Sequence, residues 1–261
     1  MPDGGRMSLT VVGCAAAWSR VPGRASSAYL VELGPPGEAA SPAILLDLGQ
    51  GSFSALSGYR DPATLSGVLI SHVHPDHCID LVPLRLYLRY GCQPARTTRL
   101  LGPADLRRRF DGLTNETDFL CDLPGDPLAP GEIEVAGFAV SVAPVLHVGP
   151  SFAFRVSDAA DPSAPGLVYS GDCGRAADLL GLTKPGDTLL VEASHGADSV
   201  IEGPNHLNAA DAAWIATATG AGRLVITHIL DDVDPAAAFA LARERFLGET
   251  LLAEPGLRVT I

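Results

Sequence analysis

Four apolar runs in this 261-residue chain each lead directly into a side chain that can bind a metal ion. Three of the runs have the length and aliphatic composition of buried β-strands. The runs and the side chains that follow them are residues 68–71 with His72, 144–146 with His147, 167–171 with Asp172 and 224–227 with His228. In layered α/β proteins, sites are built at strand ends, because loops converge there over a rigid sheet. The pattern therefore predicts a sheet edge that gathers these four side chains.

The chain as a whole alternates short β-rich runs with helix-like segments, which predicts a layered α/β protein. We expect strands at residues 9–12, 28–33, 43–48, 68–71, 99–101, 138–143, 152–156, 167–170, 188–191, 223–227 and 257–261. We expect helices at residues 52–57, 79–90, 103–110, 176–180, 208–219 and 235–247. Asn208 and Asp234 are expected as N-caps of the last two helices. Residues 34–42 and 122–132 are rich in glycine and proline, which indicates surface loops.

Length and composition favour one large domain over residues 1–261, because 47% of the residues are hydrophobic. No apolar run approaches the roughly 20 residues that are needed to span a bilayer. The apolar stretch before Cys14 covers only residues 9–12, whereas the core of a signal peptide needs roughly 7–15. The cysteines number five and form no CxxC pair, which suits a reducing compartment. We therefore expect a cytoplasmic protein with no membrane partner.

The net charge of −12 disfavours a protein whose main role is to coat nucleic acid. Basic residues nevertheless gather in residues 85–109, which end in the run Arg107, Arg108 and Arg109. Consecutive residues on a helix are about 100° apart, so these three cannot form one stripe. We interpret the segment as a solvated helix surface, and a patch for an anionic substrate is the alternative.

The stretch SHVHPDHCID contains His72, His74, Asp76 and His77 within six positions, although the chain has only seven histidines. His72 and His74 are two residues apart, so an extended backbone points both to the same side. Pro75 suits the first position of a helix or tight turn, and the two residues after it can point at a second spot nearby. The spacing offers two adjacent half-sites for zinc, iron or manganese, each still short of ligands. With the three further ligands at strand ends, it predicts metal binding.

The series H-x-H-x-D-H, a distant histidine, S-G-D, and T-H after a strand resembles the ligand series of the metallo-β-lactamase superfamily. The stretch LTVVGCAA also resembles the first strand and turn of that superfamily. The resemblance implies an αββα sandwich with a two-metal site at one edge. It implies that the first metal is held by His72, His74 and His147, that the second is held by Asp76, His77 and His228, and that Asp172 bridges both.

Asp172 indicates which branch of the superfamily the chain resembles, because class B1 and B2 β-lactamases have a cysteine at that position. An aspartate there fits the hydrolases of phosphodiesters, thioesters and lactones. The stretches LLVEAS and HLNAADAA resemble two segments of the tRNase Z group, with Val191 in place of a histidine. The resemblance implies that Glu192 orients His206, which then serves the leaving oxygen as a general acid. The alternative for His206 is a loop histidine at the start of the next helix.

Two features separate the chain from the tRNA-processing enzymes. Those enzymes carry a long tRNA-binding arm before the bridging aspartate, whereas only 24 residues lie between His147 and Asp172 here. The acidic net charge also argues against tRNA as a partner. The chain looks more like the armless phosphodiesterases of this branch, which act on small or cyclic nucleotides. His195 matches no position of the family, and we expect it to be a surface loop residue.

We predict a hydrolase with two divalent metal ions, first of all zinc and alternatively manganese or iron. It would act on a small or cyclic-nucleotide phosphodiester by attack of a hydroxide that bridges the metals. Asp76 would accept the proton of that hydroxide while binding a metal. A tRNA 3′-processing endoribonuclease and a lactone or thioester hydrolase are the alternatives. A non-catalytic metal-binding protein is disfavoured because all seven ligands are present, and the resemblance makes a homodimer a further expectation.

Overall fold

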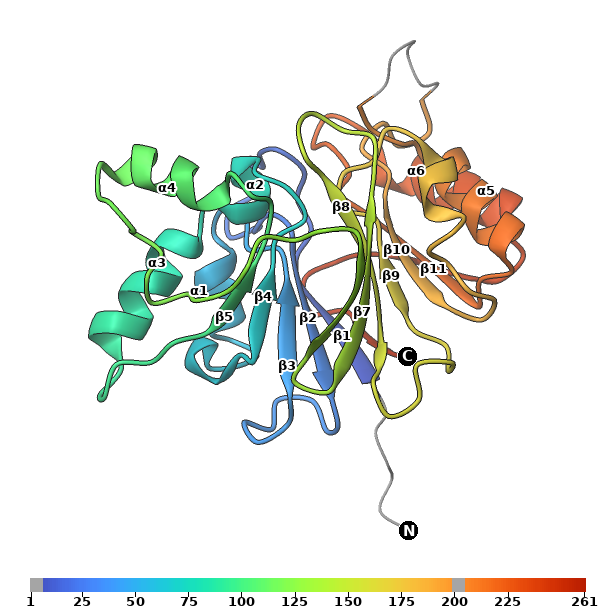
Figure 1. The fold of residues 1–261 in the computed structure, drawn as a ribbon. Coiled ribbons are helices and arrows are strands. Elements are labelled where there is room, and N and C mark those ends of the chain that lie inside the picture. The colour runs from blue at the N-terminus through green and yellow to red at the C-terminus, as the bar shows by residue number, and fades with distance from the viewer. Residues whose placement is uncertain (1–6, 199–204) are drawn as a thin grey trace.

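The computed structural model describes residues 7–198 and 205–261, which form four layers in the order helix, sheet, sheet, helix (Figure 1). Over these residues, the first sheet has the strand order β13 (Arg258–Thr260), β1 (Met7–Gly13), β2 (Ala28–Leu33), β3 (Ala43–Leu46), β4 (Gly67–Leu69) and β5 (Arg99–Leu101). The second sheet has the order β12 (Glu249–Leu252), β11 (Arg223–Thr227), β10 (Thr188–Glu192), β9 (Leu167–Tyr169), β8 (Phe152–Asp158), β7 (Phe138–Pro144) and β6 (Gly131–Val135). The predicted αββα sandwich is confirmed.

Helices cover the outer face of each sheet (Figure 1). The first sheet is covered by α1 (Ser52–Leu56), α2 (Pro75–Cys78), α3 (Leu81–Leu86) and α4 (Leu106–Thr114), with the short turns η1 (Pro62–Thr64) and η2 (Tyr87–Gly91). The second is covered by η3 (Ala176–Leu179), α5 (Ala209–Thr219) and α6 (Pro235–Arg245). Both predicted N-caps are confirmed, because the Asn208 side chain accepts from the N–H of Asp211 and the Asp234 side chain accepts from that of Ala236.

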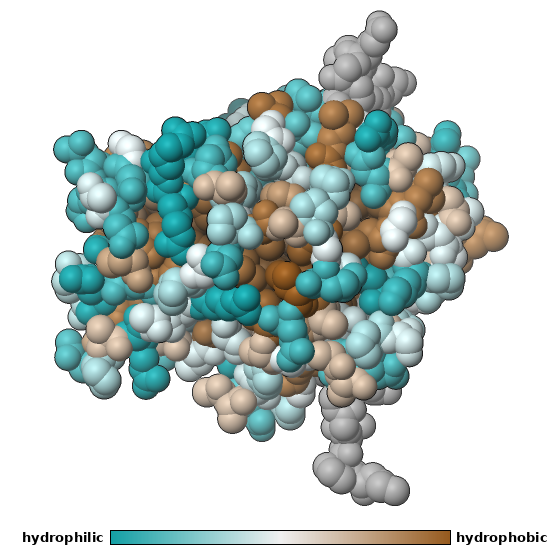
Figure 2. Space-filling model, in the orientation of Figure 1, coloured by the Kyte–Doolittle hydropathy of each residue, from teal (hydrophilic) through white to brown (hydrophobic). Residues whose placement is uncertain are grey.

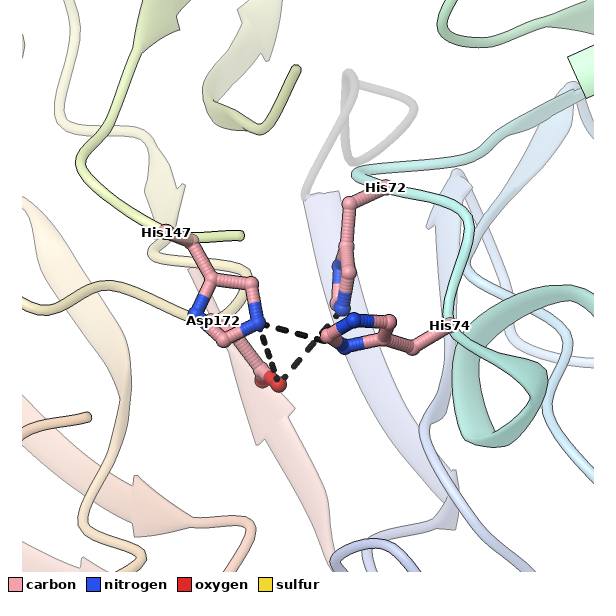
Figure 3. A group of neighbouring side chains, drawn as sticks. All are labelled: His72, His74, His147 and Asp172. Atoms are coloured by element: carbon pink, nitrogen blue, oxygen red, sulfur yellow. Dashed lines mark hydrogen bonds and ion pairs between the residues drawn. The ribbon is translucent and has the colours of Figure 1, made fainter. Parts of the chain in front are cut away.

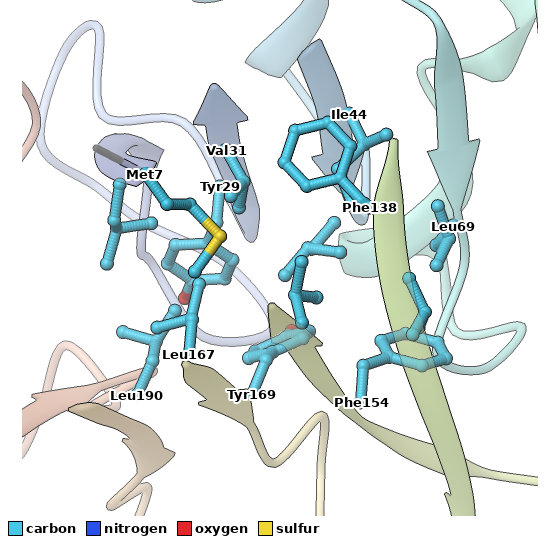
Figure 4. Close-up of a cluster of buried hydrophobic side chains, with 14 of the residues drawn as sticks. Met7, Tyr29, Val31, Ile44, Leu69, Phe138, Phe154, Leu167, Tyr169 and Leu190 are labelled. Carbon is cyan, nitrogen blue, oxygen red and sulfur yellow. The ribbon is translucent and has the colours of Figure 1, made fainter. Parts of the chain in front are cut away.

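Three apolar layers hold the four structural layers together, and the largest lies between the two sheets (Figure 4). In β7, Phe138, Val140 and Val142 point into this layer while the residues between them are only partly buried, as the two-residue period of a strand requires. Small side chains such as Ala212 and Ala213 let α5 lie close against the second sheet. On the face seen in Figure 2, hydrophobic residues come to the surface mainly toward the middle of the view.

The strand directions decide where the site is built. Strands β3, β4 and β5 run parallel in one sheet, and β9, β10, β11 and β12 run parallel in the other. The carboxyl ends of both parallel sets lie at the upper edge of the sandwich in Figure 1, on the side opposite the N-terminus. Loops that leave this edge can therefore face one another across the gap between the sheets.

Two strands and one helix differ from the sequence prediction. Strand β6 (Gly131–Val135) lies in part of the segment predicted as a loop, because this edge strand is mostly polar and lacks an apolar run. Strand β12 (Glu249–Leu252) was not predicted, and it is also an edge strand that pairs with one neighbour only. The single helix predicted at residues 79–90 is instead α3 followed by the π-helical turn η2.

Several arginines in the basic segment at residues 85–109 make structural contacts. Arg85 and Arg89 both lie within 3.3 Å of the carboxylate of Asp122. Arg107 donates to the backbone carbonyl groups of Leu120 and Leu123. These contacts lie on the outer helical layer and support the interpretation as a helix surface rather than a substrate patch. No helix in residues 7–198 and 205–261 is long and apolar enough to cross a membrane.

Candidate metal centre

The first half-site is formed by His72, His74, His147 and Asp172, whose side chains point toward one another (Figure 3). Nε2 of His72 lies 3.6 Å from Oδ2 of Asp172, and Nε2 of His147 lies 3.7 Å from the same oxygen. Nε2 of His147 and Nδ1 of His74 are 3.2 Å apart. The four ligand atoms lie within 4.8 Å of one another, so one cation can contact all of them.

The second half-site is formed by Asp76, His77 and His228. The predicted use of Pro75 as the first residue of a helix is confirmed, because the short helix α2 begins there and carries Asp76 and His77 in its first turn. Nε2 of His228 lies 3.1 Å from Nε2 of His77 and 3.2 Å from Oδ2 of Asp76. Two ring nitrogens that point at each other at this distance need a proton or a cation between them.

Asp172 lies between the two half-sites and faces both. Its Oδ2 points to the first half-site, whereas its Oδ1 lies 3.2 Å from Nε2 of His77 and 3.5 Å from Nε2 of His228. The position depends on Gly171, which has φ 55°. A Cβ atom on that glycine would lie 2.8 Å from the carbonyl oxygen of Phe152, so a side chain cannot be added without a shift of the backbone.

Hydrogen bonds to the other ring nitrogens fix the histidine tautomers. The backbone carbonyl of Asn205 lies 2.7 Å from Nδ1 of His147, and the carboxylate of Asp47 lies 2.7 Å from Nδ1 of His77. Both oxygens can only accept, so Nδ1 carries the hydrogen and Nε2 presents its lone pair to the half-site. The hydroxyl of Ser194, which lies 3.0 Å from Nδ1 of His228, supports the same tautomer there.

Asp47 is a site residue that the sequence interpretation missed. It follows β3 at φ 61°, and its Oδ2 accepts hydrogen bonds from His77, from the Ser71 hydroxyl (2.7 Å) and from the Tyr169 hydroxyl (2.6 Å). The sequence carries a signal for it, namely an acidic residue within the apolar run of residues 43–48. The strand ends at Leu46, so Asp47 is one more polar residue at a strand end.

The donor set fits metal binding. Among the residues that the structure describes, Nε2 of His72 and Oδ1 of Asp172 are buried and have no hydrogen-bond partner. Such atoms are costly to bury unless something binds them. Burial lowers the pKa of His72, His74 and His147, so these rings are neutral near pH 7 and can donate a lone pair.

The carboxylates give the centre its negative charge. Burial raises the pKa of Asp172, but the neighbouring His228, His77 and His72 outweigh it and hold that pKa well below its usual value. Burial lowers the pKa of His77, but the charges of Asp172 and Asp47 outweigh it and raise that pKa well above its usual value. The carboxylates therefore draw a proton onto His77, and a divalent cation would take the place of that proton.

Glu192 and His206 stand beside this cluster. Glu192 is the last residue of β10 and is fully buried, and its Oε1 lies 3.0 Å from Nδ1 of His206. The same carboxylate accepts from the N–H of Cys173 and from the N–H and hydroxyl of Ser194. Burial lowers the pKa of His206, but the hydrogen bond with Glu192 and its charge outweigh it and raise that pKa to about 9.

The position of His206 is also compatible with a metal ligand, because its ring lies within 4.8 Å of ligand atoms of Asp172 and His228. The atom that approaches Asp172 is Nδ1, at 3.9 Å, and Glu192 already binds that atom at 3.0 Å. The geometry therefore favours a histidine oriented by Glu192. His195, expected as a surface loop residue, lies in the turn after β10 and is half-buried, with its ring 6.1 Å from that of His206.

Known proteins resemble the chain over most of its length. Residues 44–229 match the beta-lactamase superfamily domain. An uncharacterized protein of Mycobacterium tuberculosis is 31% identical over 235 residues, which cover 85% of this chain and 80% of that protein. The probable metallo-hydrolase YhfI of Bacillus subtilis is 28% identical over 229 residues, which cover 85% of this chain and 87% of YhfI. The ribonuclease Z of Salinispora arenicola is 28% identical over 267 residues, which cover 84% of this chain and 86% of that protein.

The fold comparison agrees with these matches. The crystal structure of YhfI superposes with a TM-score of 0.84 over 98% of this chain and 100% of that chain, at 26% identity. The matched domain begins in β3 and ends just after His228, so it includes all seven candidate ligands. The chain therefore belongs to the β-lactamase superfamily and is a metallo-hydrolase.

Proposed function

We propose that the protein hydrolyses small or cyclic-nucleotide phosphodiesters with the help of two divalent ions, first of all zinc. The observation that carries this proposal is the position of His206, which is oriented by the buried Glu192 and lies beside Asp172. A carboxylate with one oxygen toward each half-site supports a centre of two ions rather than one. A histidine steered by a carboxylate adds a general acid to that centre.

Each residue of the centre has a role in this proposal. The first ion would be held by His72, His74 and His147, the second by Asp76, His77 and His228, and Asp172 would contact both. Divalent ions at such a centre supply a nucleophile from water near neutral pH and neutralise charge on phosphoryl oxygens. Asp76 would accept the proton of the attacking water. The N–H of Ala17 holds Oδ2 of that carboxylate at 2.8 Å and fixes its orientation.

His206 would protonate the leaving oxygen. Because Glu192 binds Nδ1, the proton that is transferred is the one on Nε2 of the ring. This arrangement suits an ester whose leaving group is a sugar alkoxide, which is a strong base and leaves poorly unless it is protonated. A thiolate is a much weaker base, with a pKa near 8.5, and needs no such acid. The pair of residues therefore favours a phosphodiester over a thioester.

A tRNA 3′-processing endoribonuclease is the second candidate, because the Salinispora arenicola relative is named ribonuclease Z. The segment between His147 and Asp172 argues against it. Within that segment, β8 (Phe152–Asp158) and β9 (Leu167–Tyr169) pair in the second sheet, which leaves only a short connection between them. An arm that projects to grip tRNA has no room there. The net charge of −12 also opposes binding of a polyanion.

The proposal is tested with purified protein loaded with zinc or, separately, with manganese. The substrates are 3′,5′-cyclic AMP, a dinucleotide, bis(p-nitrophenyl) phosphate, a lactone, a thioester and a precursor tRNA. The protein with His72 replaced by alanine serves as the inactive control. We expect turnover of the cyclic nucleotide and of the chromogenic diester at rates well above this control. Turnover of the lactone, the thioester or the tRNA without any small phosphodiester would contradict the proposal.

A further inference from the structure

A cavity of about 470 Å³ opens beside the second half-site, and His228 forms part of its wall. The wall comes from four segments of the chain. They are the loop after β1, the end of β11, Pro235 at the start of α6, and the residues at and just after the end of β12. The volume lies in the range of about 300–1,000 Å³ that is typical of small-molecule sites. Because His228 belongs to both the half-site and the wall, the cavity borders the metal centre.

The loop after β1 is fixed relative to the candidate ligands. The N–H of Ala17 donates to Asp76, which ties the start of the loop to the second half-site. Farther along, the Asp231 carboxylate accepts from the N–H of Arg20 at 2.8 Å and from the guanidinium of Arg24 at 3.1 Å. Asp231 itself follows His228 by three residues. These contacts hold the loop that forms one wall, so the cavity is preformed beside the metal centre.

The walls of the cavity select a ligand that is mostly apolar and carries a few polar groups. Val21, Pro22 and Leu252 supply apolar surface. Arg24 and Glu254 supply a hydrogen-bond donor and an acceptor. Such a combination suits a ring system with hydroxyl or amino groups at its edge.

The charge of the cavity argues against a second phosphate. Arg24 is the one lysine or arginine among the described residues that line the cavity, and the Asp231 carboxylate already neutralises its charge. Glu254 adds a carboxylate, so the lining has no surplus of positive charge with which to bind a further anion. A polynucleotide or a nucleoside polyphosphate would bring phosphates into this region, whereas a single nucleoside would not.

We propose that this cavity binds the nucleoside of a mononucleotide ester whose phosphate lies at the metal centre. The inference rests on the proposed phosphodiesterase function and specifies its substrate class. In this assignment, the apolar walls that fit the nucleoside are Val21, Pro22 and Leu252. The polar contacts of its sugar or base are Arg24 and Glu254. The site then accepts cyclic or simple nucleotide diesters and discriminates against substrates that carry additional phosphates in the nucleoside part.

The test fills the cavity and compares two ligands that differ only by a nucleoside. Calorimetry measures the Kd of adenosine 5′-monophosphate and of inorganic phosphate for the zinc-loaded protein. The test variant is V21W, at a loop position where the side chain is 52% exposed, and the matched control is L113W on α4, at a position that is 61% exposed. A second test variant, L252F, fills the cavity from the end of β12 in case the loop adjusts to V21W.

We expect the unaltered protein to bind adenosine 5′-monophosphate at least about tenfold more tightly than inorganic phosphate, because the preformed cavity adds nucleoside contacts. V21W and L252F should each remove most of that preference, with the affinity for inorganic phosphate and the zinc content unchanged. L113W should behave as the unaltered protein. Equal affinities for the two ligands in the unaltered protein, or a preference that survives both cavity variants, would overturn the assignment.

A parallel turnover assay with bis(p-nitrophenyl) phosphate separates this inference from the proposed function. If the protein turns over the diester but shows no preference for the nucleotide, the proposed function holds and the assignment of the cavity is wrong. If both variants abolish the preference but no diester is turned over, the cavity is a nucleotide site and the proposed phosphodiesterase function is wrong.

Discussion

Replacing Asp47 with asparagine is expected to weaken zinc binding at the second half-site more than at the first, because Asp47 contacts His77 directly and reaches His72 only through Ser71. Oδ2 of Asp47 accepts from three donors, namely Nδ1 of His77 at 2.7 Å and the hydroxyls of Ser71 and Tyr169 at 2.7 and 2.6 Å. Oδ1 accepts from the N–H of Ser71 at 2.6 Å. An amide cannot satisfy this set, because its NH2 group must replace one of two oxygens that both accept.

The size of the effect follows from these contacts. With the amide oxygen toward His77, the NH2 group faces the N–H of Ser71 and leaves a buried donor without a partner, which costs about 1–3 kcal/mol. The tautomer and orientation of His77 are then no longer enforced by a charge. Loss of such an outer contact typically weakens metal binding by about 10–100-fold. We therefore expect the zinc that is bound by His77 to show this loss of affinity.

The assay is a competitive titration of the zinc-loaded protein with a chelator, followed by measurement of zinc per chain. Asp187 provides the matched control. It is equally buried and accepts four hydrogen bonds, among them two from Arg155, but it lies at the start of β10 and away from the ligands at the other end. D187N should lower the stability and leave the zinc affinity unchanged. A D47N variant that keeps wild-type affinity for both zinc ions would refute the role given to Asp47.

Four further expectations follow from the same contacts. H206A should lower kcat by about 10²–10⁴-fold with zinc content intact; a large loss of zinc would instead make His206 a ligand. G171A should lower the midpoint of thermal unfolding and reduce zinc content, since φ is 55° and the new Cβ would lie 2.8 Å from a carbonyl oxygen; an unchanged midpoint speaks against the tight fit. F138A should cost about 3–5 kcal/mol in urea unfolding, because this ring is fully buried between the sheets; a cost below about 1 kcal/mol would contradict that packing. Removing zinc with a chelator should lower the unfolding midpoint, as loss of any ligand bound only to the folded state must, and equal midpoints would mean that the folded chain holds no zinc.

The candidate ligands could be located from sequence because each follows a strand by one to three residues or lies within one short motif. His72, His147, Asp172 and His228 lie at strand ends, and the structure brings all four to one edge of the sandwich. The residue patterns also located most strands, since a buried strand needs an unbroken apolar run. Asp47 was missed because it stands within such a run, so the pattern placed it in the strand rather than after it.

The remaining features depend on tertiary contacts that no local pattern encodes. The edge strands β6 and β12 have too few apolar residues to be recognised, and neighbouring strands stabilise them by pairing. The proximity of His195 to His206, with the two rings 6.1 Å apart, is likewise set by tertiary structure. The cavity beside His228 is formed by segments that are distant in sequence, so its volume and its charge become visible only once the chain is folded.

The most direct test of the two-ion centre is anomalous X-ray scattering from crystals of the zinc-loaded protein. We expect two peaks about 3.5–4 Å apart. One should be surrounded by His72, His74 and His147, the other by Asp76, His77 and His228, with Asp172 contacting both. A single peak, or a peak bound by His206 in place of one of these ligands, would contradict the bridged centre from which the proposed function is derived.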